Sequence, residues 1–166
     1  MTLGGRGRTA LVSRRWGHLA AAWSVTFAVL HLYWGLGGSV GLAESAGTDL
    51  AEQRPTWFVV LGLYGVALTL GVAAVLGLAL ARVHSVRRSG RLLTVLGAGL
   101  AAVLLARAVA IELLLLADAG YGGGAISEAQ RSWTLVVWNP WFLVGGTTFG
   151  LAARAARRRW TSRSAR

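Results

Sequence analysis

Four long stretches of the chain are almost free of charged residues, and shorter charged segments separate them. A helix needs about 20 mostly apolar residues, at about 1.5 Å each, to cross about 30 Å of hydrocarbon. None of the stretches alternates apolar and polar residues with the period of two that a membrane strand shows. The pattern therefore predicts an all-α protein with transmembrane helices at about residues 16–37, 56–82, 91–117 and 132–154.

The placement of arginines predicts how these helices are oriented. The N-terminal tail, the connection between the second and third helices, and the C-terminal tail, counted with the arginines at the adjoining helix ends, hold fourteen arginines and no acidic residue. The other connections hold five acidic residues and two arginines. Because positively charged residues are enriched in cytoplasmic loops, we expect both termini in the cytoplasm. Short connections make successive helices antiparallel neighbours, so the predicted fold is an up-down four-helix bundle, multi-pass in the cell (plasma) membrane.

This topology divides the chain into a basic cytoplasmic tail at 1–15, a four-span membrane domain at 16–155 and a second basic cytoplasmic tail at 156–166. The first helix begins like a secretory signal peptide. Its apolar stretch is nevertheless longer than the about 7–15 residues of a signal-peptide core, and it contains His18 and His31. We therefore expect it to be retained as the first span.

Composition agrees with a membrane protein and excludes several classes of function. Of the 166 residues, 55% are hydrophobic and only 14% are charged, whereas an average soluble protein has about 25% charged residues. The absence of cysteine excludes disulfides, thiolate metal sites and thiol redox chemistry. The net charge of +11 comes from the arginine-rich cytoplasmic segments. It indicates attraction to anionic lipids on the cytoplasmic side rather than nucleic-acid binding. The sequence has no motif of a soluble enzyme, and we expect no cofactor and no metal site.

Polar or amphipathic side chains recur at one depth in all four predicted helices. His31, Tyr64, Arg107 and Asn139 each lie 15 to 18 residues from the arginine at the cytoplasmic end of their helix, or about 22–27 Å. Glu112 lies about one and a half turns further out. Polar groups inside hydrocarbon are costly, so a shared depth indicates a common site in the outer leaflet. The candidate ligand-binding residues of this polar layer are His31, Trp34, Tyr64, Arg107, Glu112, Trp138 and Asn139.

The ionisable candidates also have structural interpretations. His31 is either a proton carrier or ligand or, as we favour, a buried histidine bonded to a backbone carbonyl or a tyrosine, with Trp34 as an interface anchor. Arg107 and Glu112 are five positions apart, so they do not form a favourable helical pair and each is expected to find its partner elsewhere. Arg107 either extends to lipid phosphate or orients an anionic group.

The fourth predicted helix contains a proline and several tryptophans. Pro140 removes a helix donor, and we expect Asn139 to satisfy backbone groups that the kink exposes. The tryptophans around Pro140, Trp138 among them, either line a ligand cavity or form an aromatic belt at the membrane interface.

Two motifs carry a resemblance to a known family. They are HLYWGLGG at 31–38 and WNPWFLVGG at 138–146, accompanied by the intramembrane Arg107. With them the chain resembles an uncharacterised family of small four-helix bacterial integral membrane proteins, domain of unknown function family 3995, over most of residues 16–155. The resemblance implies a four-span fold and a cell-membrane location, and it carries no known activity.

The sequence favours binding over catalysis as the function. We expect an integral membrane protein that binds a small or lipidic ligand, anionic if Arg107 contacts it, or a membrane partner, at the polar layer. A homo-oligomer is compatible with this expectation. The alternative is a membrane-embedded enzyme in which His31 and Glu112 act as acid and base, or a small proton-coupled carrier. A carrier usually has an ionisable residue near the membrane midplane, where these helices have none.

Overall fold

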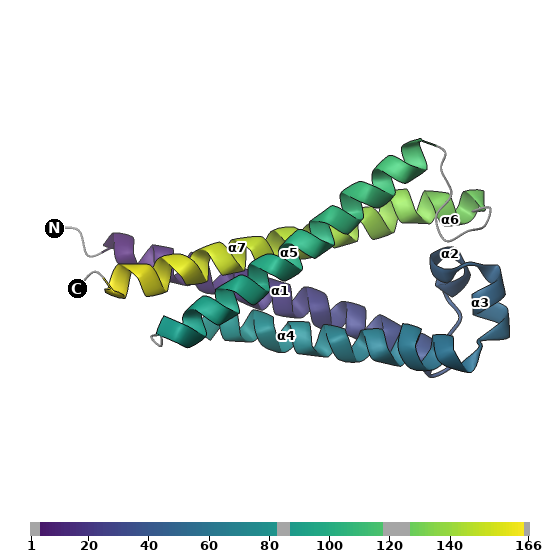
Figure 1. The fold of residues 1–166 in the computed structure, drawn as a ribbon, viewed down its shortest axis with the longest axis horizontal. Coiled ribbons are helices and arrows are strands. Elements are labelled where there is room, and N and C mark those ends of the chain that lie inside the picture. Colours follow the sequence, from purple (N-terminus) through teal and green to yellow (C-terminus); the bar gives the residue numbers. More distant parts are fainter. Residues whose placement is uncertain (1–3, 83–86, 118–126, 165–166) are drawn as a thin grey trace.

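The computed structural model describes residues 4–82, 87–117 and 127–164, and within these ranges all regular structure is helical. Four long helical stretches run alternately between the two ends of the molecule (Figure 1). α1 begins and α7 ends at the same end, while two short helices lie at the other (Figure 1). The elements are α1 (Gly4–Gly35), α2 (Leu42–Ala46), α3 (Thr48–Gln53), η1 (Phe58–Gly65), α4 (Val66–Arg82), α5 (Arg87–Leu116), α6 (Glu128–Trp133), η2 (Thr134–Trp138) and α7 (Asn139–Ser164).

The long helices occur where the sequence predicts them, but the first and the fourth extend further. α1 begins at Gly4 and α7 ends at Ser164, both inside the arginine-rich segments that we assigned to the tails. Arginine and alanine are good helix formers, so a helix can continue after its apolar pattern has ended. The apolar pattern therefore indicates where a helix can enter hydrocarbon, whereas the helix itself ends elsewhere.

Three of the helical stretches are long and apolar enough to span a membrane: Phe58–Arg82, Ser89–Leu116 and Glu128–Arg159. α1 is not among them. Its apolar stretch is interrupted by polar and amphipathic residues such as His18, Ser24 and Thr26, which lower its mean hydropathy. Membrane crossing by α1, and with it the four-span bundle, stays a prediction.

The helices pack as two antiparallel pairs. α1 lies along α4, α5 lies along α7, and contacts between α1 and α7 join the two pairs (Figure 1). The backbones of α1 and α4 come so close that a Cβ atom on Gly77 would lie 2.8 Å from the backbone nitrogen of Ala21. The main apolar core consists of Ala20, Trp23, Phe27, Leu70, Ala73, Leu80, Ala101, Leu104, Phe149, Ala152 and Ala156.

The outer faces of the η1–α4 stretch and of α5 are apolar and exposed. Large apolar side chains on these faces include Leu61, Leu68, Val72, Val75, Val95, Val103, Leu113 and Leu116. Soluble monomers rarely expose a continuous apolar surface of this kind, whereas a lipid environment covers it. The exposed faces therefore agree with the composition in favouring a membrane protein.

Arginines from other elements cap the C-terminal ends of three long helices. The guanidinium groups of Arg54, Arg131 and Arg159 donate hydrogen bonds of 2.6 to 3.2 Å to carbonyls, among them those at the ends of α1, α5 and α4 respectively. The last carbonyls of a helix lack intrahelical donors and carry the negative end of the helix dipole. Arg54 and Arg131 thereby fix the ends of α1 and α5 that carry predicted site residues.

Candidate functional site

Three of the predicted site residues form one hydrogen-bond network between α5 and α7. Asn139 is only 2% exposed. Its Oδ1 accepts a hydrogen bond from Nη1 of Arg107 at 3.3 Å, and its Nδ2 donates one to Oε2 of Glu112 at 2.5 Å. The guanidinium of Arg107 also lies over the ring of Phe142, with its central carbon 3.7 Å from the ring centroid. The amide thus bridges a cation and an anion that lie five positions apart on α5.

The network confirms one expectation about these residues and corrects another. Arg107 and Glu112 do not pair along the helix and find their partner elsewhere, and that partner is Asn139 for both. The guanidinium of Arg107 turns toward Asn139 and the attractive face of an aromatic ring, and its extension to lipid phosphate stays a prediction. Within the described residues the Asn139 amide bonds these two side chains and no backbone group near Pro140, so the expectation that it satisfies such groups is wrong. The continuous helical rod formed by η2 and α7 accommodates Pro140 directly after the wider π-helical turns of η2.

The paired glycines of the WNPWFLVGG motif position α7 between its neighbours. A Cβ atom on Gly145 would lie 2.5 Å from the ring of Trp23 on α1, and one on Gly146 would lie 2.6 Å from Leu105 on α5. The indole of Trp23 also donates to the carbonyl of Trp141 at 2.9 Å. Only residues without a side chain permit these approaches, and they bring α7 close enough to α5 for Asn139 to reach the side chains of α5.

An open groove on the surface between α5 and the η2–α7 rod borders the network. It has a volume of about 310 Å³, and its charged and amide-bearing lining residues are Glu112 and Asn139. We call it the α5–α7 groove. Arg107 is not among the residues that line it. The rest of the lining is apolar and consists of Ala108, Val109, Leu113, Leu135, Pro140 and Leu143.

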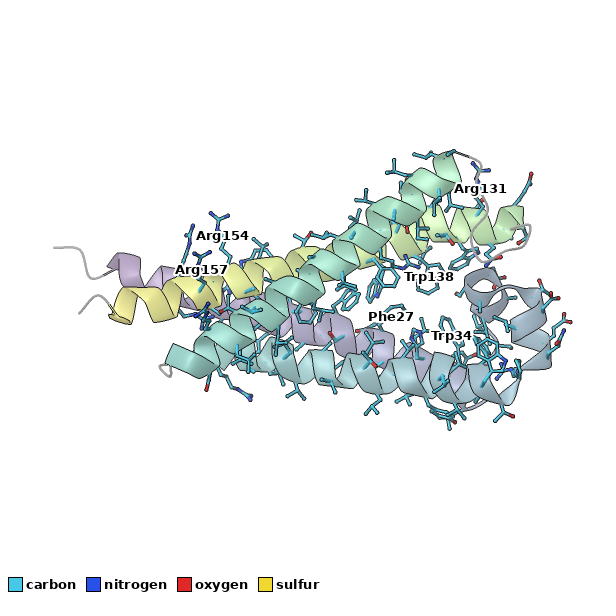
Figure 2. All side chains as sticks on the ribbon, viewed as in Figure 1. Phe27, Trp34, Arg131, Trp138, Arg154 and Arg157 are labelled. Carbon is cyan, nitrogen blue, oxygen red and sulfur yellow. The ribbon has the colours of Figure 1, made fainter. Side chains whose placement is uncertain are left out.

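His31 and Trp138 lie in an aromatic cluster between α1 and α7. Nδ1 of His31 donates to the carbonyl of Phe27 at 2.9 Å, because a carbonyl oxygen can only accept. The structural interpretation that we favoured for His31, a bond to a backbone carbonyl, is therefore confirmed. The ring of Trp138 lies 5.8 Å from Phe27 and 6.1 Å from Trp34 between centroids, and Figure 2 shows Phe27 and Trp138 between the two helix pairs. These residues are not among those that line the α5–α7 groove.

Trp34 and Tyr64 hold the end of α1. Trp34 is 3% exposed and donates from its indole to the carbonyl of Val40 at 2.8 Å, so its assignment as an interface anchor is wrong. The hydroxyl of Tyr64 donates to the carbonyl of Gly35 at 2.9 Å. A Cβ atom on Gly35 would lie 2.9 Å from the Tyr64 ring, which explains a glycine at this position of the HLYWGLGG motif. Neither side chain lines the α5–α7 groove.

Sequence reasoning missed Phe142 and two unpaired indole groups. Phe142 lies three residues after Asn139 and therefore on the same face of α7, a spacing that could have identified it as part of the network. The indole N–H groups of Trp138 and Trp141 are buried, and no acceptor reaches them in the part of the chain that the structure describes. Over the same ranges, no group of three or more histidine or acidic side chains is arranged to hold a metal ion.

Comparison with known proteins identifies one family. The family described as "Protein of unknown function (DUF3995)" matches the chain over residues 24–149, a range that contains the polar network, the α5–α7 groove and both tryptophan-rich motifs. No curated protein and no solved structure matches the chain.

Proposed function

The chain belongs to the DUF3995 family, whose description assigns no activity, and from the chain's own geometry we propose that it is an integral membrane protein that binds a lipidic ligand in the α5–α7 groove. The groove is the observation that carries this proposal, because a carboxyl and an amide group border a space whose other walls are apolar. Its volume of about 310 Å³ falls at the lower end of small-molecule pockets, about 300–1,000 Å³. A ligand with an alkyl chain and one polar head fits this lining, because its chain can contact the apolar residues while its head lies beside the carboxyl and amide groups.

The energetics of the polar network also support a ligand. A charged side chain at the centre of a membrane helix costs about 2.5–3.5 kcal/mol even on the mildest insertion scale. Buried ion pairs are often replaceable by apolar residues without loss of stability. A network that joins Arg107 to Glu112 through Asn139 beside an open groove is therefore better explained by recognition than by folding alone.

The proposal includes the membrane topology. We place four spans in the cell membrane, with both termini and the arginine-rich segments in the cytoplasm, where anionic lipids attract them. The common end at which α1 begins and α7 ends supports an even number of crossings, and Arg154 and Arg157 lie toward that end (Figure 2). In this orientation the α5–α7 groove opens within the outer leaflet.

Cysteine labelling tests the topology without background, because the chain has no native cysteine. We expect Ser127→Cys, before α6, to react in whole cells with a membrane-impermeant maleimide. We expect Ser89→Cys, near the start of α5, to react only after the cells are permeabilised. Labelling of Ser89→Cys but not of Ser127→Cys in intact cells would reverse the orientation.

Filling the groove tests ligand binding. Val109 lines the groove and is 51% exposed, so Val109→Trp is expected to fold while its ring occupies the ligand space. Native mass spectrometry of protein purified in mild detergent should then show at least about a tenfold loss of bound lipid, which corresponds to about 1.4 kcal/mol.

The matched control is Val103→Trp, because Val103 is 65% exposed on the same helix and does not line the groove. We expect this variant to retain lipid like the wild type. Equal retention by both variants would contradict the proposal. So would loss of a protein partner or of a second copy of the chain, rather than of lipid, from the Val109→Trp sample.

The geometry gives less support to the enzyme and carrier alternatives. His31 uses Nδ1 for the Phe27 carbonyl and packs edge-on against the rings of Phe27 and Trp34, whereas Glu112 belongs to the network between α5 and α7. Acid–base catalysis needs the two groups to converge on one reacting centre. No observation places them in such an arrangement.

A further inference from the structure

The charges of the polar network are unequally accessible from the α5–α7 groove. Glu112 lines the groove and is half-buried, whereas Arg107 lies on the other side of the Asn139 amide, over the ring of Phe142. A ligand that enters the groove therefore meets a carboxyl group first. This order is the reverse of what a guanidinium-based anion site requires.

The orientation of the Asn139 amide is fixed by its two partners. A guanidinium can only donate hydrogen bonds, so it must face Oδ1, and an ionised carboxylate can only accept, so it must face Nδ2. The amide oxygen is consequently directed at Arg107, which already uses one of its two acceptor positions. The charged acceptor that the groove offers to a ligand belongs to Glu112.

Glu112 has acceptor capacity to spare. An ionised carboxylate has two oxygens with about four acceptor positions. In the part of the chain that the structure describes, the Asn139 amide is the one donor that reaches this carboxyl group, through Oε2. The apolar residues around the groove offer no further donor side chain. A donor brought by a ligand would therefore form a charge-assisted hydrogen bond in a water-poor environment, where such bonds are strongest.

We propose that the ligand of the α5–α7 groove has a hydrogen-bond donor as its head, a primary ammonium or a hydroxyl group on an alkyl chain, and that the Glu112 carboxylate accepts a hydrogen bond from this head. This inference rests on the proposed lipid-binding function and specifies its ligand class. An anionic head without a donor is disfavoured, because it would face the like charge of Glu112.

Paired lipids that differ only in the donor test this inference. Delipidated wild-type protein in detergent is mixed with equal amounts of dioleoylphosphatidylethanolamine, whose ammonium donates, and dioleoylphosphatidylcholine, whose methylated nitrogen does not. A second pair sets dioleoylglycerol against its methyl ether. Native mass spectrometry then measures the ratio of bound lipids. We expect the donor lipid to exceed its methylated counterpart about tenfold in at least one pair, equivalent to about 1.4 kcal/mol. The pair that shows the excess distinguishes an ammonium from a hydroxyl ligand.

Two isosteric variants locate the acceptor. Glu112→Gln should reduce the preference to a ratio of about one, because its amide lacks the negative charge. Glu52→Gln, an exposed residue of α3 away from the groove, should leave the ratio unchanged. The comparison of lipids in the wild type requires no variant, so the inference is tested even if Glu112→Gln does not fold.

The outcomes separate this inference from the proposed function. If both members of each lipid pair bind equally and Val109→Trp abolishes their binding, the inferred donor head is wrong and the proposed lipid-binding function is retained. If no lipid binds the wild type more than Val109→Trp, the proposed function fails. Dioleoylphosphatidylmethanol is an anion without a donor. If it binds the wild type in preference to the donor lipids and this preference is lost in Arg107→Gln, the inference is overturned in favour of an anionic ligand.

Discussion

Replacing Asn139 by leucine is expected to lower the free energy of unfolding by about 3 kcal/mol, although leucine has a similar size and is more apolar. The amide is 2% exposed and bonds both Arg107 and Glu112. A buried polar group that loses its partner costs about 1–3 kcal/mol and more when it is charged. Breaking one side of a buried charge network typically costs about 3–5 kcal/mol. Asn139→Leu removes the shared partner of two charged groups in one step.

Equilibrium unfolding in mixed micelles measures this effect. Leu114→Ala is the control, since Leu114 is 38% exposed on α5, two residues after Glu112. Its truncation should cost about 1 kcal/mol or less, because the side chain is only partly buried. If Asn139→Leu were as stable as the wild type, the network would not contribute to the free energy of unfolding as its geometry implies.

Gly77→Ala, which adds a single methyl group, is expected to lower the free energy of unfolding by about 2–3 kcal/mol. The same change at Gly71 is expected to be neutral or stabilising. A Cβ atom on Gly77 would lie 2.8 Å from the Ala21 nitrogen and 3.0 Å from the Gly17 carbonyl oxygen. Both atoms belong to the backbone of α1, so the helices must separate, and overpacking of this kind costs about 1–3 kcal/mol. Around Gly71, in the same helix, nothing lies within 4 Å of the added atom.

The two alanine variants are compared in one unfolding assay. Gly71→Ala should gain up to about 1 kcal/mol, because alanine favours the helix over glycine. The changes in the free energy of unfolding at these two positions of one helix should have opposite signs. That result distinguishes close helix packing from a general effect of replacing glycine. Equal effects at the two positions would show that α1 and α4 do not approach as closely as the structure has them.

The helical architecture was predictable from the sequence because apolar stretches and arginine clusters are properties of single segments. The network was only partly predictable. The spacing of Arg107 and Glu112 on one helix excludes a direct pair, but it does not identify Asn139 as their common partner. That identification needs the register of α7 against α5, which Gly146 sets through its contact with Leu105.

Two other features needed tertiary information as well. Trp34 was expected at the membrane interface, yet residues after α1 fold into α2 and α3, and Leu42 packs with Trp34 in a second apolar cluster. The small residues at 17 and 21 and at 77 and 81 form patterns typical of close helix contacts. In a chain with 23 glycines such patterns have low specificity, so the α1–α4 contact could not be selected from them.

Lipid retention by the triple variant Arg107→Leu/Glu112→Leu/Asn139→Leu tests most directly whether the polar network serves a ligand. Replacing all three residues removes both charges of the network together with the amide that joins them, so the variant should be more stable than Asn139→Leu and close to or above the wild type. Native mass spectrometry should show that this folded variant has lost the lipid that the wild type retains and Val109→Trp lacks. Retention of that lipid at the wild-type level would contradict the assignment of the network as the ligand site.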